Sequence, residues 1–584
     1  MKKRLIVAFV SGALILAGGP PKPPKVGKGI NTSSSAAVNV LVKYNSSPAS
    51  ATIQNALSCG GVVNVVTGLL NAVSFSVPGN KVATLANDPN VDYVVLDRPL
   101  QVSGNWVGSL PDYGWRSIGA DQAASVFGLT GKGIGVAVID SGMDNLDDLK
   151  SANGGNRIVY SQSFVPGDLS TTDQFGHGDH VAGILGGTGK DSTGGNYTYT
   201  VRGVAPGVNF INLKVLNSQG QGSDSAVISA IATAIVLKPI FNIRVINLSL
   251  GRPVEDYCAN DLLCQAVQLA WQSGIVVVAA AGNGGRDNTF GTDGYATITV
   301  PGNNPSIITV GATNTMGTLT ETDDIIASYS SKGPTLLDHY AKPDVVAPGN
   351  QIFSLRTPGS YLDTNYSGDD VPLSVYENTS ANSAGPYFVL SGTSMATPMV
   401  SGAAALMIEQ DPALTPDQVK ARLMLTANKF ADTTYTITDP TTGQTFNEQN
   451  DVFTVGAGYV NIPAALSSTE IVGSPAVSPT AVLLPNPAGV TLTFPSATGT
   501  SNVLWGSGSL FGANVIWGSN VLWGSNVLWG SSAVWGGSST SSSNVLWGSS
   551  AIWGSSALWT SSSIDAENVL WGSRGGGGRQ GDPR

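Results

Sequence analysis

The chain has 584 residues, of which 42% are hydrophobic and only 12% are charged. This length is enough for several domains, each burying a core of its own. The formal net charge is −10, and no run of lysine and arginine follows Lys2-Lys3-Arg4. Because binding to a phosphate backbone depends on clustered positive charge, we expect no nucleic-acid partner. Three cysteines are too few for a fold built on disulfides.

The N-terminus, residues 1–19, is typical of a secretion signal. The basic residues Lys2-Lys3-Arg4 precede an apolar run, Leu5–Ala17, that is too short to cross a bilayer comfortably. Small residues at Ala17-Gly18-Gly19 offer a cleavage site. We therefore expect a secreted protein, extracellular or associated with the cell surface; the alternative is a single N-terminal membrane anchor.

Residues 20–37 are rich in proline and serine and are expected to form a linker. In residues 38–101, short apolar runs and helical patterns follow the order strand, helix, strand, strand, helix, strand. This βαββαβ order is that of a ferredoxin-like module. The expected strands are Val38–Tyr44, Val62–Val66, Ala72–Val77 and Val91–Leu96, and the expected helices are Ala51–Ser58 and Lys81–Asn87.

Between residues 106 and 466 short apolar strands alternate with helical patterns. This alternation predicts an α/β domain with a parallel sheet that is covered on both faces. Reactive groups in such sheets collect at the carboxyl ends of the strands. The clearest strands are Val136–Ile139, Val208–Val215, Val245–Leu250 and Ile275–Ala280, and the clearest helices are Ser223–Leu237 and Leu262–Gln272.

The C-terminal part is of low complexity. Residues 467–500 are rich in proline, serine and threonine and are expected to be a linker, and residues 574–584 a disordered tail. Residues 501–573 repeat the hexapeptide Ser-Asn-Val-Leu-Trp-Gly. Six is a multiple of the strand period of two, so the tryptophans would share one face of an extended chain. We expect a β-solenoid or, alternatively, a flexible chain, which in either case contacts the cell surface, polysaccharide or other copies.

Three segments carry the groups that acyl transfer by an activated serine requires. Asp140 ends the strand at Val136–Ile139, and His177 lies among small residues at an expected helix start. Ser394 follows Gly392 and Thr393, where a helix would begin and aim its N–H groups outward. Singly, these residues could be a turn residue, a buried histidine and a helix cap. Together they supply a nucleophile, a base and a carboxylate that orients the base.

In the order Asp, His, Ser, these residues resemble the subtilisin-like serine peptidases, or subtilases. The resemblance covers residues 115–466 and implies the α/β sandwich of that family. Residues 38–101 are similar to its propeptide, a folding assistant and inhibitor. Further matching segments are Val204–Gly207, Ser249-Leu250-Gly251, Ala280–Gly284, Tyr329–Pro334 and Lys342–Gly349.

The resemblance implies a role for each matched residue. Ser394 would be the nucleophile, His177 the general base and Asp140 the group that holds the imidazole. Asn283 would donate to the oxyanion together with the Ser394 N–H group. Ser249, Leu250 and Gly251 would form the strand that pairs with an extended substrate.

The chain departs from the family at Asp179, where threonine is usual. An Asp179 that faces the imidazole would favour its protonated form and move activity to higher pH, whereas one that faces solvent or caps the helix would change little. The catalytic chemistry requires no cofactor. Structural calcium is left open at Asp144, Asp147 and Asp148, since three nearby carboxylates also suit a solvated acidic loop.

His177 and His180 are not expected to bind a metal, because the sequence has no His-Glu-x-x-His helix and a single further histidine, His339. Cys258 and Cys264 are expected to form a disulfide in an exported protein, with three free thiols as the alternative. Cys59 would be lost with the propeptide.

We therefore expect a secreted serine endopeptidase that hydrolyses proteins or peptides through an acyl-enzyme. It would mature by cutting off its own propeptide, which acts as its inhibitor, and the mature chain would begin between about Leu100 and Trp115. A surface or matrix binding protein with a degenerate peptidase domain and a functional C-terminal repeat is the alternative.

Overall fold

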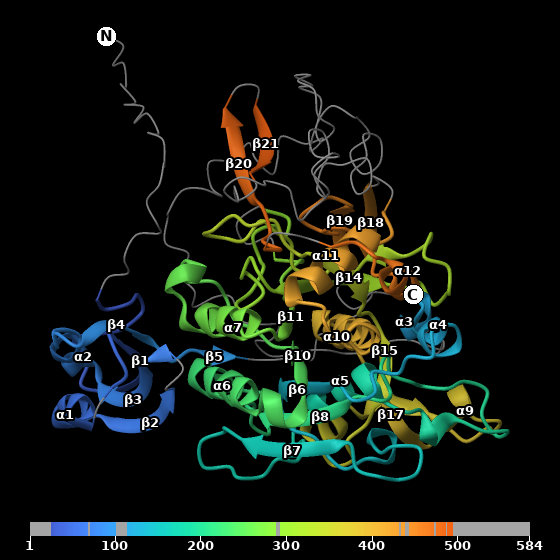
Figure 1. Cartoon of the computed structure of the whole chain (residues 1–584), viewed down its shortest axis with the longest axis horizontal. Helices are drawn as coiled ribbons and strands as arrows, with labels where there is room; N and C mark the ends of the chain where they lie inside the picture. Colours follow the sequence, from blue (N-terminus) through green and yellow to red (C-terminus); the bar gives the residue numbers. More distant parts are fainter. Residues whose placement is uncertain are drawn as a thin grey trace.

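The computed structural model describes residues 25–48, 50–67, 70–100, 114–287, 292–430, 434–438, 443–471, 475–485 and 488–493. These residues form an N-terminal module, up to residue 100, that lies beside a larger α/β domain (Figure 1). The expected signal at residues 1–19, the hexapeptide repeat at 501–573 and the tail at 574–584 lie outside the described residues.

The N-terminal module is a four-stranded antiparallel sheet with two helices. Its strand order is β2-β3-β1-β4, so β1 lies between β3 and β4. Val40, Phe75 and Val94 from the strands and Ala56 and Val82 from the helices share a core of their own. The predicted βαββαβ order is confirmed, with bounds within two residues. The elements are β1 (Ala37–Tyr44), α1 (Ser50–Ser58), β2 (Val62–Thr67), β3 (Ala72–Pro78), α2 (Gly79–Ala86) and β4 (Val91–Leu96).

Part of the expected linker at residues 20–37 belongs to this module. The Gly27 N–H group donates to the carbonyl of Val94 at 2.7 Å, and the Val94 N–H group donates to the carbonyl of Lys25 at 2.9 Å. The side chains of Val26 and Ile30 pack against the module core. Strand β4 is an edge strand whose free backbone groups accept this segment.

The sheet of the α/β domain is mostly parallel, with the order β13-β12-β11-β10-β6-β8-β7 and with β14 beside β12. The predicted sheet is found, but it is mixed rather than purely parallel, because β13 pairs antiparallel with β12 at the edge. Its central strands are buried along their whole length, as expected for a sheet that is covered on both faces. The strands are β6 (Gly135–Asp140), β7 (Ile158–Ser163), β8 (Asn209–Lys214), β10 (Ile243–Leu248), β11 (Val276–Ala280), β12 (Ile308–Asn314), β13 (Ile325–Ile326) and β14 (Val345–Pro348).

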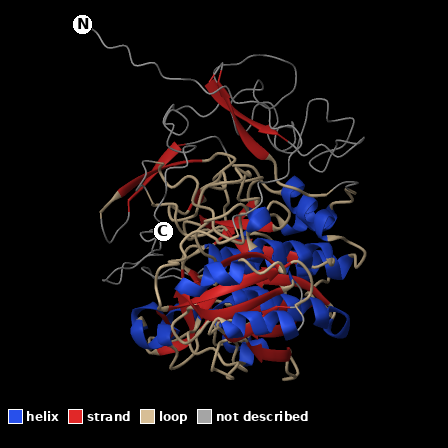
Figure 2. Ribbon diagram, turned by 90° about the vertical axis from the view of Figure 1, so that its left-hand side faces the viewer, coloured by secondary structure: helices blue, strands red, loops and turns tan. Residues whose placement is uncertain are grey.

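Helices lie on both sides of this sheet (Figure 2). Helices α5 (His177–Gly186) and α10 (Thr393–Gln410) pack against each other, and α10 also packs on β10, β11 and β12. Helices α6 (Asp224–Phe241) and α7 (Leu262–Gln272) form a second pair, which packs on β6, β10 and β11. Among the described helices, α6 alone is long and apolar enough to cross a membrane by length and composition.

Smaller elements complete the α/β domain. A three-stranded sheet has the order β15-β17-β16, and a hairpin is formed by β18 and β19. The elements are α3 (Gly114–Ser117), α4 (Ala120–Ser125), β15 (Ile352–Leu355), α8 (Tyr361–Asn365), β16 (Asp370–Pro372), α9 (Leu373–Tyr376), β17 (Ala384–Leu390), α11 (Pro416–Thr426), β18 (Thr434–Thr438), β19 (Thr445–Gln449) and α12 (Ile462–Ser467).

The expected linker at residues 467–500 contains a hairpin that is attached to the domain. Its strands are β20 (Thr480–Pro485) and β21 (Ala488–Thr493). Just before it, the Ser478 hydroxyl donates to Asp344 at 2.6 Å and lies 3.0 Å from the buried ammonium of Lys420. A composition rich in proline and serine therefore does not make this segment a free linker.

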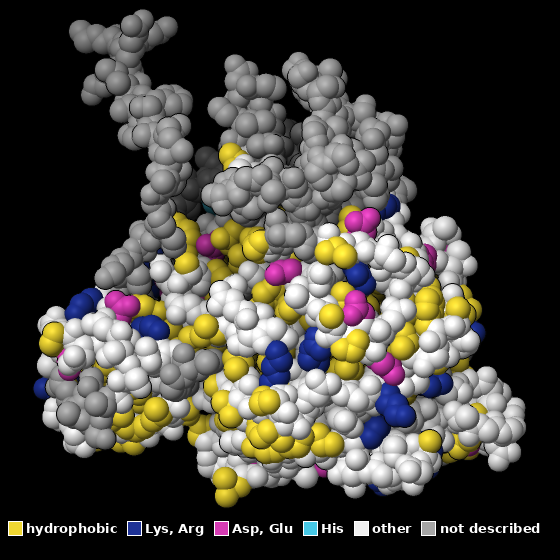
Figure 3. Space-filling view, in the orientation of Figure 1, with side chains coloured by type: hydrophobic (Ala, Val, Ile, Leu, Met, Phe, Trp, Pro, Cys, Tyr) yellow, Lys and Arg dark blue, Asp and Glu magenta, His cyan; other side chains and the backbone are white. Residues whose placement is uncertain are grey.

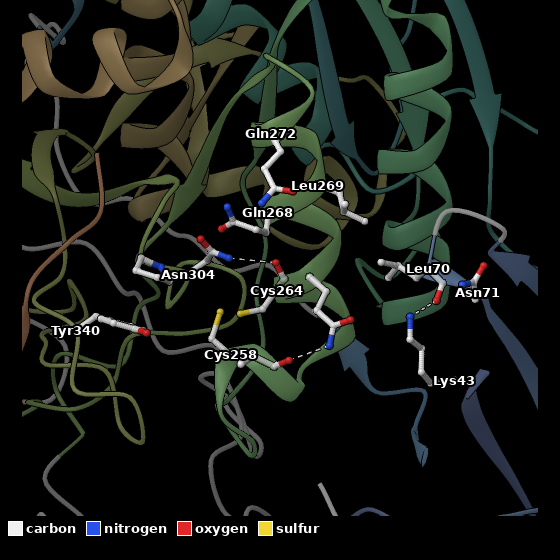
Figure 4. A pocket seen from close by; sticks show the side chains of 13 residues that line it. Lys43, Leu70, Asn71, Cys258, Cys264, Gln268, Leu269, Gln272, Asn304 and Tyr340 are labelled. Atoms are coloured by element: carbon white, nitrogen blue, oxygen red, sulfur yellow. Dashed lines mark hydrogen bonds between the residues drawn. The ribbon is translucent and has the colours of Figure 1, made fainter. Parts of the chain in front are cut away.

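A cavity of about 450 Å³ lies where the module meets the α/β domain (Figure 4). Leu70 and Asn71 line it from the module, and Cys258 and Cys264 line it from the domain. The two sulfur atoms point toward each other in Figure 4, but both cysteines are free thiols. The disulfide expected between them is therefore not formed in this structure. Burial raises the pKa of both thiols.

Figure 3 shows how charged side chains are distributed on one face of the molecule. On the face shown in Figure 3, described lysines and arginines are scattered among apolar and uncharged side chains. This face therefore presents no continuous basic surface of the kind that a phosphate backbone binds.

Candidate active site

Asp140 and His177 form a buried pair at the carboxyl edge of the main sheet. Asp140 is the last residue of β6, and His177 is the first residue of α5. The Nδ1 atom of His177 lies 2.8 Å from Oδ1 of Asp140, and both side chains are 1% exposed. Because Nδ1 donates to the carboxylate, Nε2 is the free basic nitrogen of the ring. Nε2 is buried and has no hydrogen-bond partner among the residues that the structure describes.

A polar clip fixes the positions of these two residues. The Ser141 hydroxyl donates to Asp173 at 2.7 Å and accepts a hydrogen bond from the Gly178 N–H group at 2.9 Å. Asp173 also accepts from the Gly176 N–H group at 2.8 Å. The end of β6 and the first turn of α5 are thereby joined through the Ser141 side chain, next to Asp140, and the Gly178 backbone, next to His177.

Ser394 is held at the start of α10 by a reciprocal pair of hydrogen bonds with Ser249. The Ser249 hydroxyl donates to the carbonyl of Ser394 at 2.8 Å, and the Ser394 hydroxyl donates to the carbonyl of Ser249 at 3.0 Å. Pro398 explains why the Ser394 carbonyl is available. It lies four residues further along α10 and has no N–H group with which to close the helical hydrogen bond.

Asn283 follows β11 and is oriented by the residue that precedes Ser394. Its Oδ1 atom accepts from the N–H group of Thr393 at 2.9 Å and from the Thr393 hydroxyl at 3.1 Å. The Thr393 hydroxyl in turn accepts from the Gly282 N–H group at 3.1 Å. Since its oxygen is fixed in this way, the amide NH2 group is the end of Asn283 that can donate to a ligand.

The predicted site residues thus form two groups on neighbouring elements. Asp140 and His177 form one, and Ser394, Ser249 and Asn283 form the other, with the helices of His177 and Ser394 packed together. The Ser394 hydroxyl points to a backbone carbonyl rather than to the imidazole, and catalytic hydrogen bonds commonly align only when substrate is bound. Leu250 is buried, and Gly251 lies against Thr299, where a side chain would not fit.

Asp179 neither faces the imidazole nor faces solvent or caps the helix, which were the two expectations. It is completely buried, with Oδ1 accepting from the Asp144 N–H group at 2.8 Å and Oδ2 bonded to the Thr357 hydroxyl at 2.8 Å. It therefore neither faces the imidazole nor reaches solvent. Burial, reinforced by the charges of Asp173 and Asp144, raises the pKa of Asp179 well above its usual range. This environment favours the protonated, neutral form of Asp179.

The three acidic residues considered for calcium do not converge on one point. Asp147 is half-exposed and pairs with Lys150 at 2.7 Å and Lys190 at 3.1 Å. Asp148 is buried and accepts from the Tyr387 hydroxyl at 2.8 Å, and Asp144 lies beside Asp179. Within the part of the chain that the structure describes, no three histidine, cysteine or acidic side chains are grouped as metal ligands would be.

His180, the second histidine of the motif, has a structural role. Its Nε2 atom lies 3.2 Å from the carbonyl of Ile352 and 3.1 Å from the carbonyl of Phe388. Complete burial, together with nearby His177, lowers the pKa of His180 to about 3. A neutral ring that donates to backbone carbonyls joins α5 to the small sheet.

Sequence reasoning missed three residues that position the site. Ser141 follows Asp140 directly and could have been found, since a hydroxyl beside a buried carboxylate needs a partner. Pro398 inside a predicted helix was also a visible signal. Asp173 lies in a loop without any motif, and only the folded chain reveals its contacts.

Comparison with known proteins gives concordant results. Residues 131–458 match the model of the Subtilase family. The chain is 39% identical over 309 residues to the serine protease AprX of Bacillus subtilis, covering 52% of this chain and 63% of AprX. It is 35% identical over 377 residues to subtilisin E of the same organism, covering 64% of this chain and 80% of subtilisin E.

Among solved structures, fervidolysin from Fervidobacterium pennivorans, described as a keratinolytic enzyme related to subtilisin, is similar with a TM-score of 0.54. The match covers 74% of this chain and 61% of fervidolysin at 22% identity, and therefore supports the fold alone.

Proposed function

The chain belongs to the subtilase family, the subtilisin-like serine endopeptidases, and on this premise we propose that it cleaves proteins outside the cell with Ser394 and frees itself by self-cleavage. The observation that carries the proposal is the Asp140–His177 pair. Its 2.8 Å hydrogen bond leaves a basic Nε2 atom on a helix packed against the helix of Ser394.

In the proposed reaction, the Ser394 hydroxyl turns from the Ser249 carbonyl toward His177. Nε2 of His177 takes the hydroxyl proton while the oxygen attacks the carbonyl carbon of the peptide bond. Asp140 keeps Nδ1 protonated and stabilises the imidazolium that forms. The imidazolium then protonates the leaving amine, so that an acyl-enzyme remains, and a water molecule attacks this ester by the same proton route.

Negative charge develops on the substrate oxygen during both attacks. The NH2 group of Asn283 and the N–H group of Ser394 would donate to this oxygen. Thr393 contributes indirectly, because it holds the amide oxygen and so sets the direction of the NH2 group. The site is thus arranged for a transition-state charge without needing a metal or cofactor for this step.

Self-cleavage is supported by the path of the module's last residues. Strand β5 (Pro99–Leu100) pairs antiparallel with β9 (Gly222–Ser223) of the α/β domain. Asp97 accepts from the N–H group of Ser225 at 2.9 Å in the first turn of α6. The last described residues of the module therefore lie on the α/β domain, and we place the cut between about Leu100 and Trp115. Secretion is proposed from the sequence of residues 1–19.

Labelling with a fluorophosphonate probe tests this function, because the probe reacts only with an activated serine. The matured wild-type protein should carry one adduct, mapped to Ser394 by peptide mass spectrometry. Ser394→Ala should carry none, while the control Ser391→Ala, three residues away, should still be labelled. An unlabelled wild-type protein, or equal labelling of Ser394→Ala, would contradict the proposal.

A further inference from the structure

The last described residues of the module occupy the α/β domain as an added strand. Pro99 lies opposite Ser223, and Leu100 lies opposite Gly222. The pairing extends one residue further, since the Asp224 N–H group donates to the carbonyl of Arg98 at 3.0 Å. Arg98 is therefore held by its backbone two residues before the position that faces Gly222, as an extended peptide would be.

The side chain of Arg98 enters a group of carboxylates, which we call the acidic recess, formed by Glu255, Asp256 and Asp261. Its Nε atom lies 2.8 Å from Glu255, and its two terminal nitrogens lie 2.7 Å from Asp256 and 3.4 Å from Asp261. Arg98 follows β4, the last strand of the module's own sheet, and is only 5% exposed. The two terminal nitrogens of Arg98 donate hydrogen bonds to Asp256 and Asp261, and Glu255 adds an ion pair, so the recess surrounds one guanidinium with three carboxylates.

The recess is anchored to the substrate-binding side of the domain. Arg252, directly after Gly251, pairs with Asp224 through bonds of 2.8 and 2.9 Å and with Asp261 at 2.6 Å. Asp224 directly follows β9. The two chain segments that would flank an extended substrate therefore meet at the recess, which places it beside the path of a peptide.

Removal of the module leaves the recess short of positive charge. Four carboxylates, those of Asp224, Asp261, Glu255 and Asp256, then face the single guanidinium of Arg252. Among the described residues, Arg98 is the one cation paired with Glu255 and Asp256. Asp261 is buried, Glu255 and Asp256 are partly exposed, and like charges this close together favour a new cationic partner. A peptide that follows the path of residues 98–100 would supply this cation.

We propose that Glu255, Asp256 and Asp261 form an additional substrate subsite that selects arginine two residues upstream of the position that pairs with Gly222. This inference rests on the proposed endopeptidase function and names a preference of the same site. The occupant is a basic side chain of a protein substrate, and Arg98 takes its place until the module leaves. Lysine would bind less well, because its ammonium cannot form the same fork of hydrogen bonds.

The test uses two peptides of residues 95–115, one with arginine at position 98 and one with citrulline, which has the same shape but no charge. Matured wild-type enzyme should hydrolyse the arginine peptide with a kcat/KM about 10- to 100-fold higher, as expected for hydrogen bonds to charged groups. The difference should lie mainly in KM and should shrink in 1 M salt, because Glu255 and Asp256 are partly exposed.

In the double variant Glu255→Gln/Asp256→Asn, the ratio of kcat/KM for the arginine peptide to kcat/KM for the citrulline peptide should fall to near one. Because both peptides are hydrolysed by the same variant, a general loss of activity lowers both kcat/KM values and leaves their ratio unchanged. The matched control Asp323→Asn/Glu470→Gln removes two carboxylates that are exposed on other elements, and should keep the wild-type ratio.

Casein hydrolysis separates the two proposals. If the matured enzyme cleaves neither casein nor the peptides, the proposed function is wrong. If it cleaves casein but does not prefer the arginine peptide, or if the preference survives in Glu255→Gln/Asp256→Asn, the function stands and the subsite is overturned.

Discussion

The N-terminal module and the α/β domain bury different kinds of side chain. Among its described residues, the module buries three polar side chains, those of Ser74, Asp88 and Arg98, and the last of these is buried by carboxylates of the other region. The α/β domain buries whole charge networks, such as Lys342 and Lys420 around Asp344, at 2.6 and 3.0 Å. The contact between the two regions combines apolar side chains such as Leu41, Leu70 and Tyr93 with the ion pairs of Arg98, whereas the charge network around Asp344 has its partners inside the α/β domain.

The largest expected effect is at Ser394, the proposed nucleophile in the α/β domain. Ser394→Ala should lower kcat/KM by about 10⁴-fold or more, because it removes the attacking oxygen. The melting temperature should change little, since the Ser249 hydroxyl still has the backbone carbonyl of residue 394 as its acceptor. Peptide hydrolysis by a sample free of other proteases checks this. Near-normal turnover by Ser394→Ala would show that Ser394 is not the catalytic nucleophile.

The next largest effect is expected at Asn283. Asn283→Asp keeps the oxygen that accepts from Thr393 and loses the NH2 donor, so kcat should fall by about 10²- to 10³-fold with KM little changed. Thr393→Val leaves the NH2 group of Asn283 in place but removes the hydroxyl that donates to the Asn283 amide oxygen. It should therefore cause a smaller loss in kcat. Steady-state kinetics of both variants measures these changes. An equal loss of kcat in both would argue against a specific role for the amide NH2 group.

Two truncations test whether residues 469–500 contribute to the stability of the α/β domain. A chain ending at Ser468 loses Ser478, which bonds to Lys420 and Asp344, and loses the buried Ala476 and Ala481. Its free energy of unfolding should fall by roughly 2 to 4 kcal/mol. A chain ending at Thr500 keeps all of these contacts and should match the full chain, with activity on peptides retained. Denaturant unfolding of both chains decides the point, and equal stability would show that residues 469–500 are a linker after all.

The smallest expected effect is that of Asp179. Its raised pKa means that the folded chain holds a proton that the unfolded chain releases near pH 4, so wild-type stability falls as pH rises above that value. Asp179→Asn removes this dependence. Its advantage in Tm should widen with pH, by roughly 2 to 4 °C for each kcal/mol of ionisation cost removed.

Thermal melts of Asp179→Asn and wild type between pH 4 and 9 would measure this difference. The pH profile of kcat should be the same in both, because Asp179 bonds to Asp144 and Thr357 and not to His177. A shifted kinetic pKa in Asp179→Asn would instead show that this carboxyl acts on the imidazole.

Local patterns explain why much of the fold could be predicted. Each strand of the module is a short apolar run between turn residues, and Val91–Leu96 and the helix Leu262–Gln272 have the predicted bounds. Asp140, His177 and Ser394 could be found because each ends a strand or begins a helix. Asp179 could not be understood in this way, since its partner Thr357 lies 178 residues further along the chain. The attachment of residues 475–485 likewise depends on Lys420 and Asp344, whose burial no local pattern reveals.

The central claim, that the N-terminal module is cut from the catalytic domain by Ser394, is tested most directly by N-terminal sequencing. The full chain and its Ser394→Ala variant would be produced in a purified translation system that lacks other proteases. The wild-type product should begin between about Leu100 and Trp115, while the variant should keep the module attached. A wild-type product that still begins near Pro20, or a variant cut at the wild-type position, would contradict the account.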